Sequence, residues 1–135
     1  MKTAVIILNW NGRKMMEQYL PSVCKYTTGE DVKIVVADNG STDDSIDFLR
    51  NNYPQIELIL LDQNYGFAEG YNRAIAQVDA EYVVLLNSDV EVTENWLTTL
   101  TDYMDSHPDI AACQPKVLAY YDKEHFEHAG ASGGF

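Results

Sequence analysis

Clusters of Asn and Asp follow four apolar runs of the chain, and their side chains carry most of the chemistry that the sequence suggests. The four clusters are Asn9-Trp10-Asn11, Asp38-Asn39, Asp62-Gln63-Asn64 and Asn87-Ser88-Asp89. Asp89 has the most specific signal, because a carboxylate just past a strongly apolar run can hold Mg²⁺ or Mn²⁺ against diphosphate oxygens. Asn87 would be a second, uncharged group beside the metal ion. The alternative is that Asn87 and Asp89 only begin a turn.

Asp38 has two interpretations, because it directly follows an apolar run where an isolated buried carboxylate would be costly. As a ligand-binding residue it would accept N–H groups of a nucleobase or hydroxyls of a ribose. As a structural residue it would cap the turn at Asn39-Gly40. The residues alone leave both interpretations open.

The segment from Gly66 to Gly70 has neither the dinucleotide-binding glycine pattern nor the Walker pattern. We expect Gly66 and Gly70 on one helix face, where a missing side chain allows close approach of a ligand or of the sheet. Arg73 follows one turn later. It would either reach a phosphate or lie solvated at the surface.

The elements that must position these residues alternate between strand and helix. This alternation predicts an α/β fold with a mostly parallel, Rossmann-like sheet flanked by helices. The strands are expected at residues 3–9, 32–37, 56–61 and 81–86. Because open parallel sheets bind ligands outside the carboxyl ends of their strands, we expect the polar clusters to meet at one edge. Ser41 and Asp44 resemble a capping box for the helix after the second strand.

Length and charge limit the classes of function. The chain has 135 residues, 46% of them apolar, which suits one compact domain. A net charge of −12 with nine scattered basic residues argues against nucleic-acid binding, and a phosphate ligand would need a metal ion or helix N-termini. No run approaches the roughly 18 apolar residues of a membrane span. We therefore expect a cytoplasmic protein, an assignment that includes the inner face of the membrane.

Four stretches together resemble the successive motifs of family 2 glycosyltransferases, in particular bacterial rhamnosyltransferase-like enzymes of cell-surface polysaccharide synthesis. The resemblance covers about the first 118 residues. The four stretches are residues 5–12, 35–43, 64–72 and 85–89.

The resemblance implies a GT-A fold and a nucleotide-diphosphate sugar donor, most simply a UDP- or dTDP-sugar, with Mg²⁺ or Mn²⁺ as cofactor. The acceptor would be a glycan or a lipid-linked molecule. Asp89 would bind the metal, as the last residue of an element that begins with Asn87 where the family usually has Asp. The residues implied in nucleotide-sugar binding are Asn9, Trp10, Asn11, Asp38, Asn39, Asn64, Gly66, Gly70, Asn87 and Ser88.

The family's later motif, which supplies a carboxylate base for inverting transfer, has no match after Asp89. Glu124 and Glu127 do not lie in that sequence context. We therefore expect residues 1–118 to form a nucleotide-sugar-binding domain, and residues 119–135 a weakly structured tail that begins a missing acceptor half. The chain alone would be inactive.

Two alternatives belong to other classes. The first is a non-catalytic nucleotide-sugar binding or regulatory module. The second is a phosphoacceptor receiver-like domain. That type needs an acidic pair after the first strand, where this chain has only Asn9-Trp10-Asn11.

Overall fold

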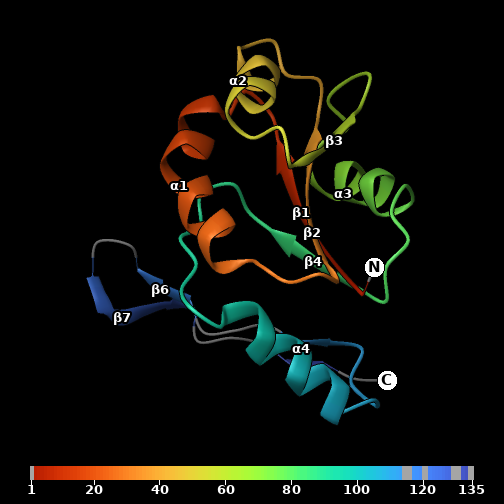
Figure 1. The fold of residues 1–135 in the computed structure, drawn as a ribbon, viewed down its shortest axis with the longest axis vertical. Helices are drawn as coiled ribbons and strands as arrows, with labels where there is room; N and C mark the ends of the chain where they lie inside the picture. Colours follow the sequence, from red (N-terminus) through yellow and green to blue (C-terminus); the bar gives the residue numbers. More distant parts are fainter. Residues whose placement is uncertain (1, 114–116, 120–121, 129–131, 134–135) are drawn as a thin grey trace. The chain divides into compact units, whose positions relative to one another are not determined.

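The computed structural model describes residues 2–113, 117–119, 122–128 and 132–133. The chain divides into two compact units, residues 1–92 and 93–135. Figure 1 shows the elements of both units along the chain.

The first unit is built on a four-stranded parallel sheet with the order β3-β2-β1-β4. This arrangement confirms the predicted α/β class and the parallel sheet. The register places Asn9, the last residue of β1, beside Asp38, the last residue of β2. The first two polar clusters therefore meet at one edge of the sheet. The strands are β1 (Thr3–Asn9), β2 (Val32–Asp38), β3 (Glu57–Leu60) and β4 (Tyr82–Leu86).

Helices cover both faces of this sheet, which explains why the strands read as continuous apolar runs. The helices are α1 (Arg13–Tyr26), α2 (Ser45–Asn52) and α3 (Phe67–Ile75). On one face, Ala4 and Ile6 pack in a buried cluster with Tyr71 and Ala74 of α3. Figure 1 shows α1 on the opposite side of the sheet, and its buried stripe is Met16, Leu20 and Val23. Loops that leave the strand ends are thus held by a rigid, packed frame.

The second unit contains α4 (Trp96–Ser106) and short antiparallel strands. Strand β5 (Ala112–Cys113) pairs with β8 (Ser132–Gly133), and β6 (Val117–Ala119) pairs with β7 (Asp122–His128). Strand β7 lies within the segment for which the sequence predicted a weakly structured tail, and that expectation stays a prediction. Its polar sequence has no apolar alternation, and backbone pairing with β6 defines it instead. The division at residues 118 and 119 stays a prediction, and residues 120–121, 129–131 and 134–135 lie outside the described ranges.

No helix in the described ranges is both long enough and apolar enough to cross a lipid bilayer. Cys24 and Cys113 are free thiols, each partly buried. Burial raises the pKa of the Cys24 thiol, which favours the unreactive protonated form.

Candidate functional site

Hydrogen bonds between side chains join the carboxyl ends of β1 and β2. Asn9 Nδ2 donates to Asp38 Oδ1 at 3.0 Å and to Ser41 Oγ at 3.2 Å. The other carboxylate oxygen of Asp38 accepts from the Ser41 backbone N–H at 2.9 Å. Asn9 and Asp38 are each only 1% exposed. Asp38 thus caps the turn that follows β2, and a contact of its carboxylate with a ligand stays a prediction.

Asn11 links the same two loops further along the sheet edge. Its backbone N–H donates to Ser41 Oγ at 2.9 Å. Its side-chain Oδ1 accepts from the backbone N–H groups of Thr42, at 2.7 Å, and Asp43, at 3.2 Å. Asn11 has a φ of 50°, a left-handed conformation that Asn tolerates better than most residues. The β1–α1 and β2–α2 loops therefore form one connected structure.

The predicted capping box at Ser41 and Asp44 is wrong. The Ser41 hydroxyl bonds to the β1–α1 loop, and Asp44 at the start of α2 makes no capping hydrogen bond through its side chain. Asp43 takes this role instead, since it accepts from the Ser45 backbone N–H at 3.0 Å and from the Ser45 hydroxyl. Partial burial acts to raise the pKa of Asp43, but these bonds and one from the Arg13 backbone hold the pKa below its usual value.

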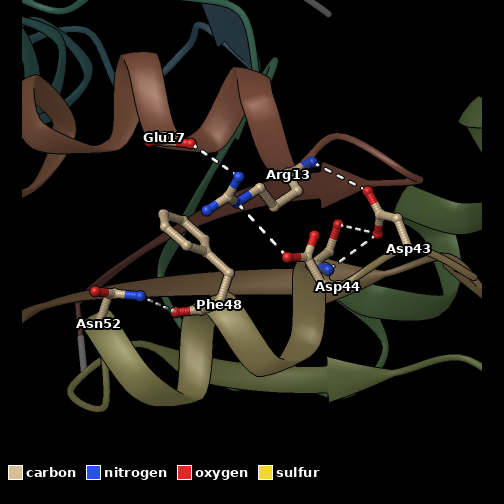
Figure 2. A network of polar contacts seen from close by, with 7 residues as sticks. Arg13, Glu17, Asp43, Asp44, Phe48 and Asn52 are labelled. Carbon is tan, nitrogen blue, oxygen red and sulfur yellow. Dashed lines mark hydrogen bonds and ion pairs between the residues drawn. The ribbon is translucent and has the colours of Figure 1, made fainter.

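Arg13 connects the first turn of α1 to α2, as Figure 2 shows. Its guanidinium lies 3.2 Å from the Glu17 carboxylate and 3.9 Å from the Asp44 carboxylate. The same guanidinium lies over the Phe48 ring, 5.0 Å from its centroid. These contacts hold α1 and α2 together. They also pair the Arg13 guanidinium with groups of the protein itself.

Asn39 extends the connections to the loop between β3 and α3. Its Nδ2 donates to Asn64 Oδ1 at 3.1 Å and to the Gly66 carbonyl at 3.0 Å. Its Oδ1 accepts from the Tyr65 backbone N–H at 3.0 Å. The Gly66 backbone N–H donates to Asn64 Oδ1 at 2.8 Å. Polar side chains thus join the loops after β1, β2 and β3.

Gly66 and Gly70 lie one turn apart, joined by a hydrogen bond from the Gly70 N–H to the Gly66 carbonyl at 3.1 Å, but only Gly70 lies within α3. Gly66 precedes α3 with a φ of 79° and a ψ of −176°, a conformation that is almost restricted to glycine. Gly70 lies within α3 and is buried. A Cβ on Gly70 would lie 2.9 Å from Asn39 Nδ2 and 3.0 Å from a Leu8 methyl group. Gly70 therefore allows α3 to approach the sheet closely.

An open groove of about 490 Å³ lies over this edge of the sheet. Seven residues of the predicted set line it, from all four polar clusters: Trp10, Asn39, Asn64, Gly66, Asn87, Ser88 and Asp89. Four predicted residues do not line it: Asn9, Asn11, Asp38 and Gly70. The groove also includes residues that the sequence reasoning missed, namely Leu8, Met15, Phe67 and Tyr71.

Exposed aromatic rings form part of the groove wall. Trp10 is 55% exposed and Phe67 is 65% exposed. Phe67 packs edge-on against Tyr71, with 4.9 Å between ring centroids. The buried Tyr71 hydroxyl donates to the Leu86 carbonyl at 2.9 Å, and burial raises the pKa of Tyr71, so the hydroxyl stays protonated. The wall is thereby fixed to the end of β4, where Asn87 begins.

Asn87, Ser88 and Asp89 differ from the other three clusters. Asn87 and Asp89 are exposed, and across the described residues neither has a hydrogen bond or ion pair. The described part of the chain holds no cluster of three or more His, Cys, Asp or Glu side chains suited to a metal. Asp89 could therefore supply one carboxylate to a hard cation whose other ligands come from water and phosphate. Among the residues that the structure describes, the groove lining contains no Lys or Arg.

Arg73 does not line the groove. Its guanidinium lies 3.8 Å from the Tyr65 ring centroid and 3.3 Å from the Glu69 carboxylate. It borders a separate depression of about 420 Å³ with Leu60 and Gln77. The structure thus favours the surface role for Arg73.

Comparison with known proteins decides the family. The sequence pattern described as "Glycosyl transferase family 2" matches residues 4–132. The chain belongs to glycosyltransferase family 2. It is 27% identical over 124 residues to an N-acetylglucosaminyl-diphospho-decaprenol L-rhamnosyltransferase of Mycobacterium tuberculosis, covering 84% of this chain and 40% of the relative. It is 28% identical over 115 residues to an abequosyltransferase of Salmonella typhimurium, covering 82% of this chain and 34% of the relative.

Solved structures confirm the GT-A fold of this family 2 domain. S. aureus TarS 1-349 in complex with UDP-GlcNAc has a TM-score of 0.70 and 22% identity, covering 90% of this chain and 42% of that one. A mannosyltransferase of Pyrobaculum calidifontis in complex with GDP-Man and Mn²⁺ has a TM-score of 0.68 and 22% identity, covering 87% of this chain and 34% of that one. The family 2 chain thus spans less than half the length of these relatives.

Proposed function

We propose that this chain is the donor-binding part of an inverting glycosyltransferase that uses a nucleotide-diphosphate sugar, most simply a UDP- or dTDP-sugar. The observation that carries the proposal is the groove at the carboxyl edge of the sheet, with aromatic rings on its wall and, in its lining, the Asp89 carboxylate, which has no partner among the described residues. The names of the relatives support a sugar nucleotide as ligand, since two neighbours were solved with UDP-GlcNAc or GDP-Man.

The order of the strands suggests how the donor lies. Asp89 follows β4, whereas Asn39 follows β2, two strands away. Neighbouring strands are about 4.8 Å apart, so these positions are separated by about 10 Å. That separation suits a nucleotide with its diphosphate at Asp89 and its base near Asn39 and Asn64. Trp10, after the intervening β1, would lie against the nucleoside.

The residues present fit a divalent cation at the diphosphate. Asp89 would hold Mg²⁺ or Mn²⁺ through its carboxylate, with the Asn87 carbonyl oxygen as a neutral neighbour. When bound, the cation would offset the charge that develops on the leaving diphosphate. Asp89 and Asn87 would orient the diphosphate end. Ser88 lies between them in the sequence and also lines the groove.

The rest of the reaction belongs to the whole protein. A carboxylate base in the acceptor half, outside this chain, would remove the proton of the acceptor hydroxyl. The acceptor would be a glycan or a lipid-linked molecule in cell-surface polysaccharide synthesis. The protein would act in the cytoplasm, including the inner face of the membrane. This 135-residue chain alone would bind the donor without transferring sugar.

A thermal-shift titration tests the proposal. The chain is titrated with UDP, dTDP, GDP and CDP, each with and without Mn²⁺, and the experiment is repeated on Asp89→Asn. Asp79→Asn is the matched control, because Asp79 is an exposed carboxylate of the same unit outside the groove. A nucleotide at 100 times its Kd should add about 2.7 kcal/mol to the unfolding free energy.

We expect Mn²⁺-dependent stabilisation by at least one nucleotide, lost in Asp89→Asn and kept in Asp79→Asn. A folded chain that no nucleotide stabilises would contradict the proposal. Stabilisation that survives in Asp89→Asn would contradict the assigned metal site alone.

A further inference from the structure

Backbone groups fix the orientation of the Asn39 carboxamide. Its Oδ1 faces the Tyr65 N–H, which can only donate, and its Nδ2 faces the Gly66 carbonyl, which can only accept. If the amide were rotated by 180°, a donor would face a donor and an acceptor would face an acceptor. Both ends of Asn39 are therefore engaged inside the protein, although its side chain lines the groove.

Asn39 in turn fixes Asn64. Asn64 Oδ1 accepts from Asn39 Nδ2 at 3.1 Å and from the Gly66 N–H at 2.8 Å. An amide has one oxygen and one NH₂ group, so this arrangement leaves the NH₂ group of Asn64 as its free end. Among the described residues that NH₂ group has no partner, and Asn64 is an exposed residue that lines the groove.

Gly70 makes room for this arrangement. A Cβ at that position would approach Asn39 Nδ2 to 2.9 Å, the same atom that donates to Asn64. The absence of a side chain on Gly70 lets Asn39 occupy its place between the sheet and α3.

We propose that Asn39 is a positioning residue: it holds the Asn64 carboxamide so that the NH₂ group of Asn64 donates to a carbonyl oxygen of the donor's nucleobase. This inference rests on the proposed function, because it places the base over the loop between β3 and α3. Asn39 acts through Asn64 and does not itself bind the base.

Substitutions that change one atom test this arrangement. Asn39→Asp keeps the acceptor for the Tyr65 N–H but replaces the donor by an oxygen that faces Asn64 Oδ1. Asn64 then either keeps its Oδ1 against the new oxygen or turns its NH₂ group inward against the Gly66 N–H, and both outcomes disturb the group that Asn64 presents to the base. Asn64→Asp keeps the acceptor for Asn39 and Gly66 but places a carboxylate oxygen toward the base. Asn72→Asp is the matched control, since Asn72 is an exposed residue of α3 outside the groove lining.

The experiment is a calorimetric titration of each variant with Mn²⁺ and UDP, dTDP, GDP or CDP. For the nucleotide that the unchanged chain binds most tightly, we expect Asn39→Asp and Asn64→Asp each to raise Kd about tenfold or more, because a buried donor–acceptor mismatch replaces a hydrogen bond. Asn72→Asp should leave Kd within about twofold, as expected for a surface substitution away from the site.

A double variant separates positioning from a general loss of structure. If Asn39 acts through Asn64, Asn39→Asp should have little further effect on Kd when Asn64 is already Ala, because the two substitutions remove the same contact. NMR of the unchanged chain gives a second readout. The Asn39 NH₂ protons should be protected from exchange, and only the Asn64 NH₂ resonances should shift when nucleotide binds.

An unchanged Kd in folded Asn39→Asp would overturn the inference. So would an effect of Asn39→Asp that is equally large in the Asn64→Ala background. If Asn39→Asp does not fold, an Asn64 NH₂ resonance that does not respond to bound nucleotide overturns it instead. If the unchanged chain binds none of the nucleotides, the proposed function itself fails, and this outcome is distinct from the others.

Discussion

The Asn9 carboxamide donates a 3.0 Å hydrogen bond to the buried Asp38 carboxylate, which also accepts from the Ser41 backbone. Asp38→Asn would place an NH₂ group against either Asn9 Nδ2 or the Ser41 N–H. We expect the unfolding free energy to fall by about 1–3 kcal/mol, since one buried donor loses its acceptor. Urea unfolding without any ligand measures this change.

Nucleotide binding by Asp38→Asn distinguishes a ligand-binding role of the Asp38 carboxylate from a structural one. Unchanged stability combined with lost binding would assign the Asp38 carboxylate to the ligand and would contradict its structural role in the turn. Reduced stability with binding retained at low temperature would support that role.

Gly70→Ala should destabilise the chain even though Ala is the better helix former. The helix gains about 1 kcal/mol from the substitution. The new Cβ would lie 2.9 Å from Asn39 Nδ2 and within 3.1 Å of two Leu8 methyl groups, and hydrogen bonds hold Asn39 in place. Overpacking costs about 1–3 kcal/mol, so we expect a net loss near 1 kcal/mol. Thermal unfolding measures the change. Ala68→Gly, at an exposed position of α3, is the control variant. A Gly70→Ala chain that is more stable than the unchanged chain would contradict the close packing.

Trp10→Ala should weaken nucleotide binding without affecting the fold. Trp10 is 55% exposed, so its removal should change the unfolding free energy by less than about 0.5 kcal/mol. Stacking of a base on an aromatic ring contributes about 1–3 kcal/mol, which predicts a rise in Kd of about fivefold or more. Leu60→Ala removes a comparably exposed apolar side chain (50% exposed) outside the groove and should leave Kd unchanged. Equal effects of both substitutions would contradict a specific role for Trp10.

Mn²⁺ should strengthen the binding of UDP but not of uridine. The described residues of the groove lining include no Lys or Arg, and Asp89 adds a negative charge where the diphosphate would lie. A cation at Asp89 would turn this repulsion into attraction, so we expect the Kd of UDP to fall about tenfold or more. Calorimetry of both ligands at fixed ionic strength measures the difference. An equal response of uridine would place the metal away from the diphosphate.

Acid should remove the stabilising contribution of Asp43. Hydrogen bonds from Ser45 and from the Arg13 backbone hold the pKa of Asp43 below its usual value, so the folded state favours the ionised carboxylate. The contribution is present above the unfolded-state pKa of about 3.9 and is lost as the pH falls through the lower folded-state pKa. The Tm advantage over Asp43→Asn should therefore be constant above about pH 5 and shrink below about pH 4. A Tm difference that stays the same at every pH would contradict this.

The sequence predicted the parallel sheet and the edge at which the polar clusters meet, because buried strands require continuous apolar runs. It did not predict which polar groups would be engaged with one another. Asn9 and Asp38 are 29 positions apart, and Asn39 and Asn64 are 25 apart, so their bonds depend on strand register and loop conformation. Ser41 shows the limit of local patterns, since its hydroxyl bonds to Asn9 and not to the helix that follows. One signal in the sequence could have indicated the groove wall: Phe67 directly follows Gly66, next to the polar cluster that ends at Asn64.

The bonds between the loops after β1, β2 and β3 have a mechanical consequence. Asn9, Asn11 and Asn39 make these loops a single body, whereas within the described residues no side chain of Asn87 to Asp89 joins it. The groove thus has one stiff end and one compliant end. Any adjustment on closing around a ligand should be concentrated at Asp89, and amide exchange should be slow at Tyr65 and Thr42 but fast at Ser88.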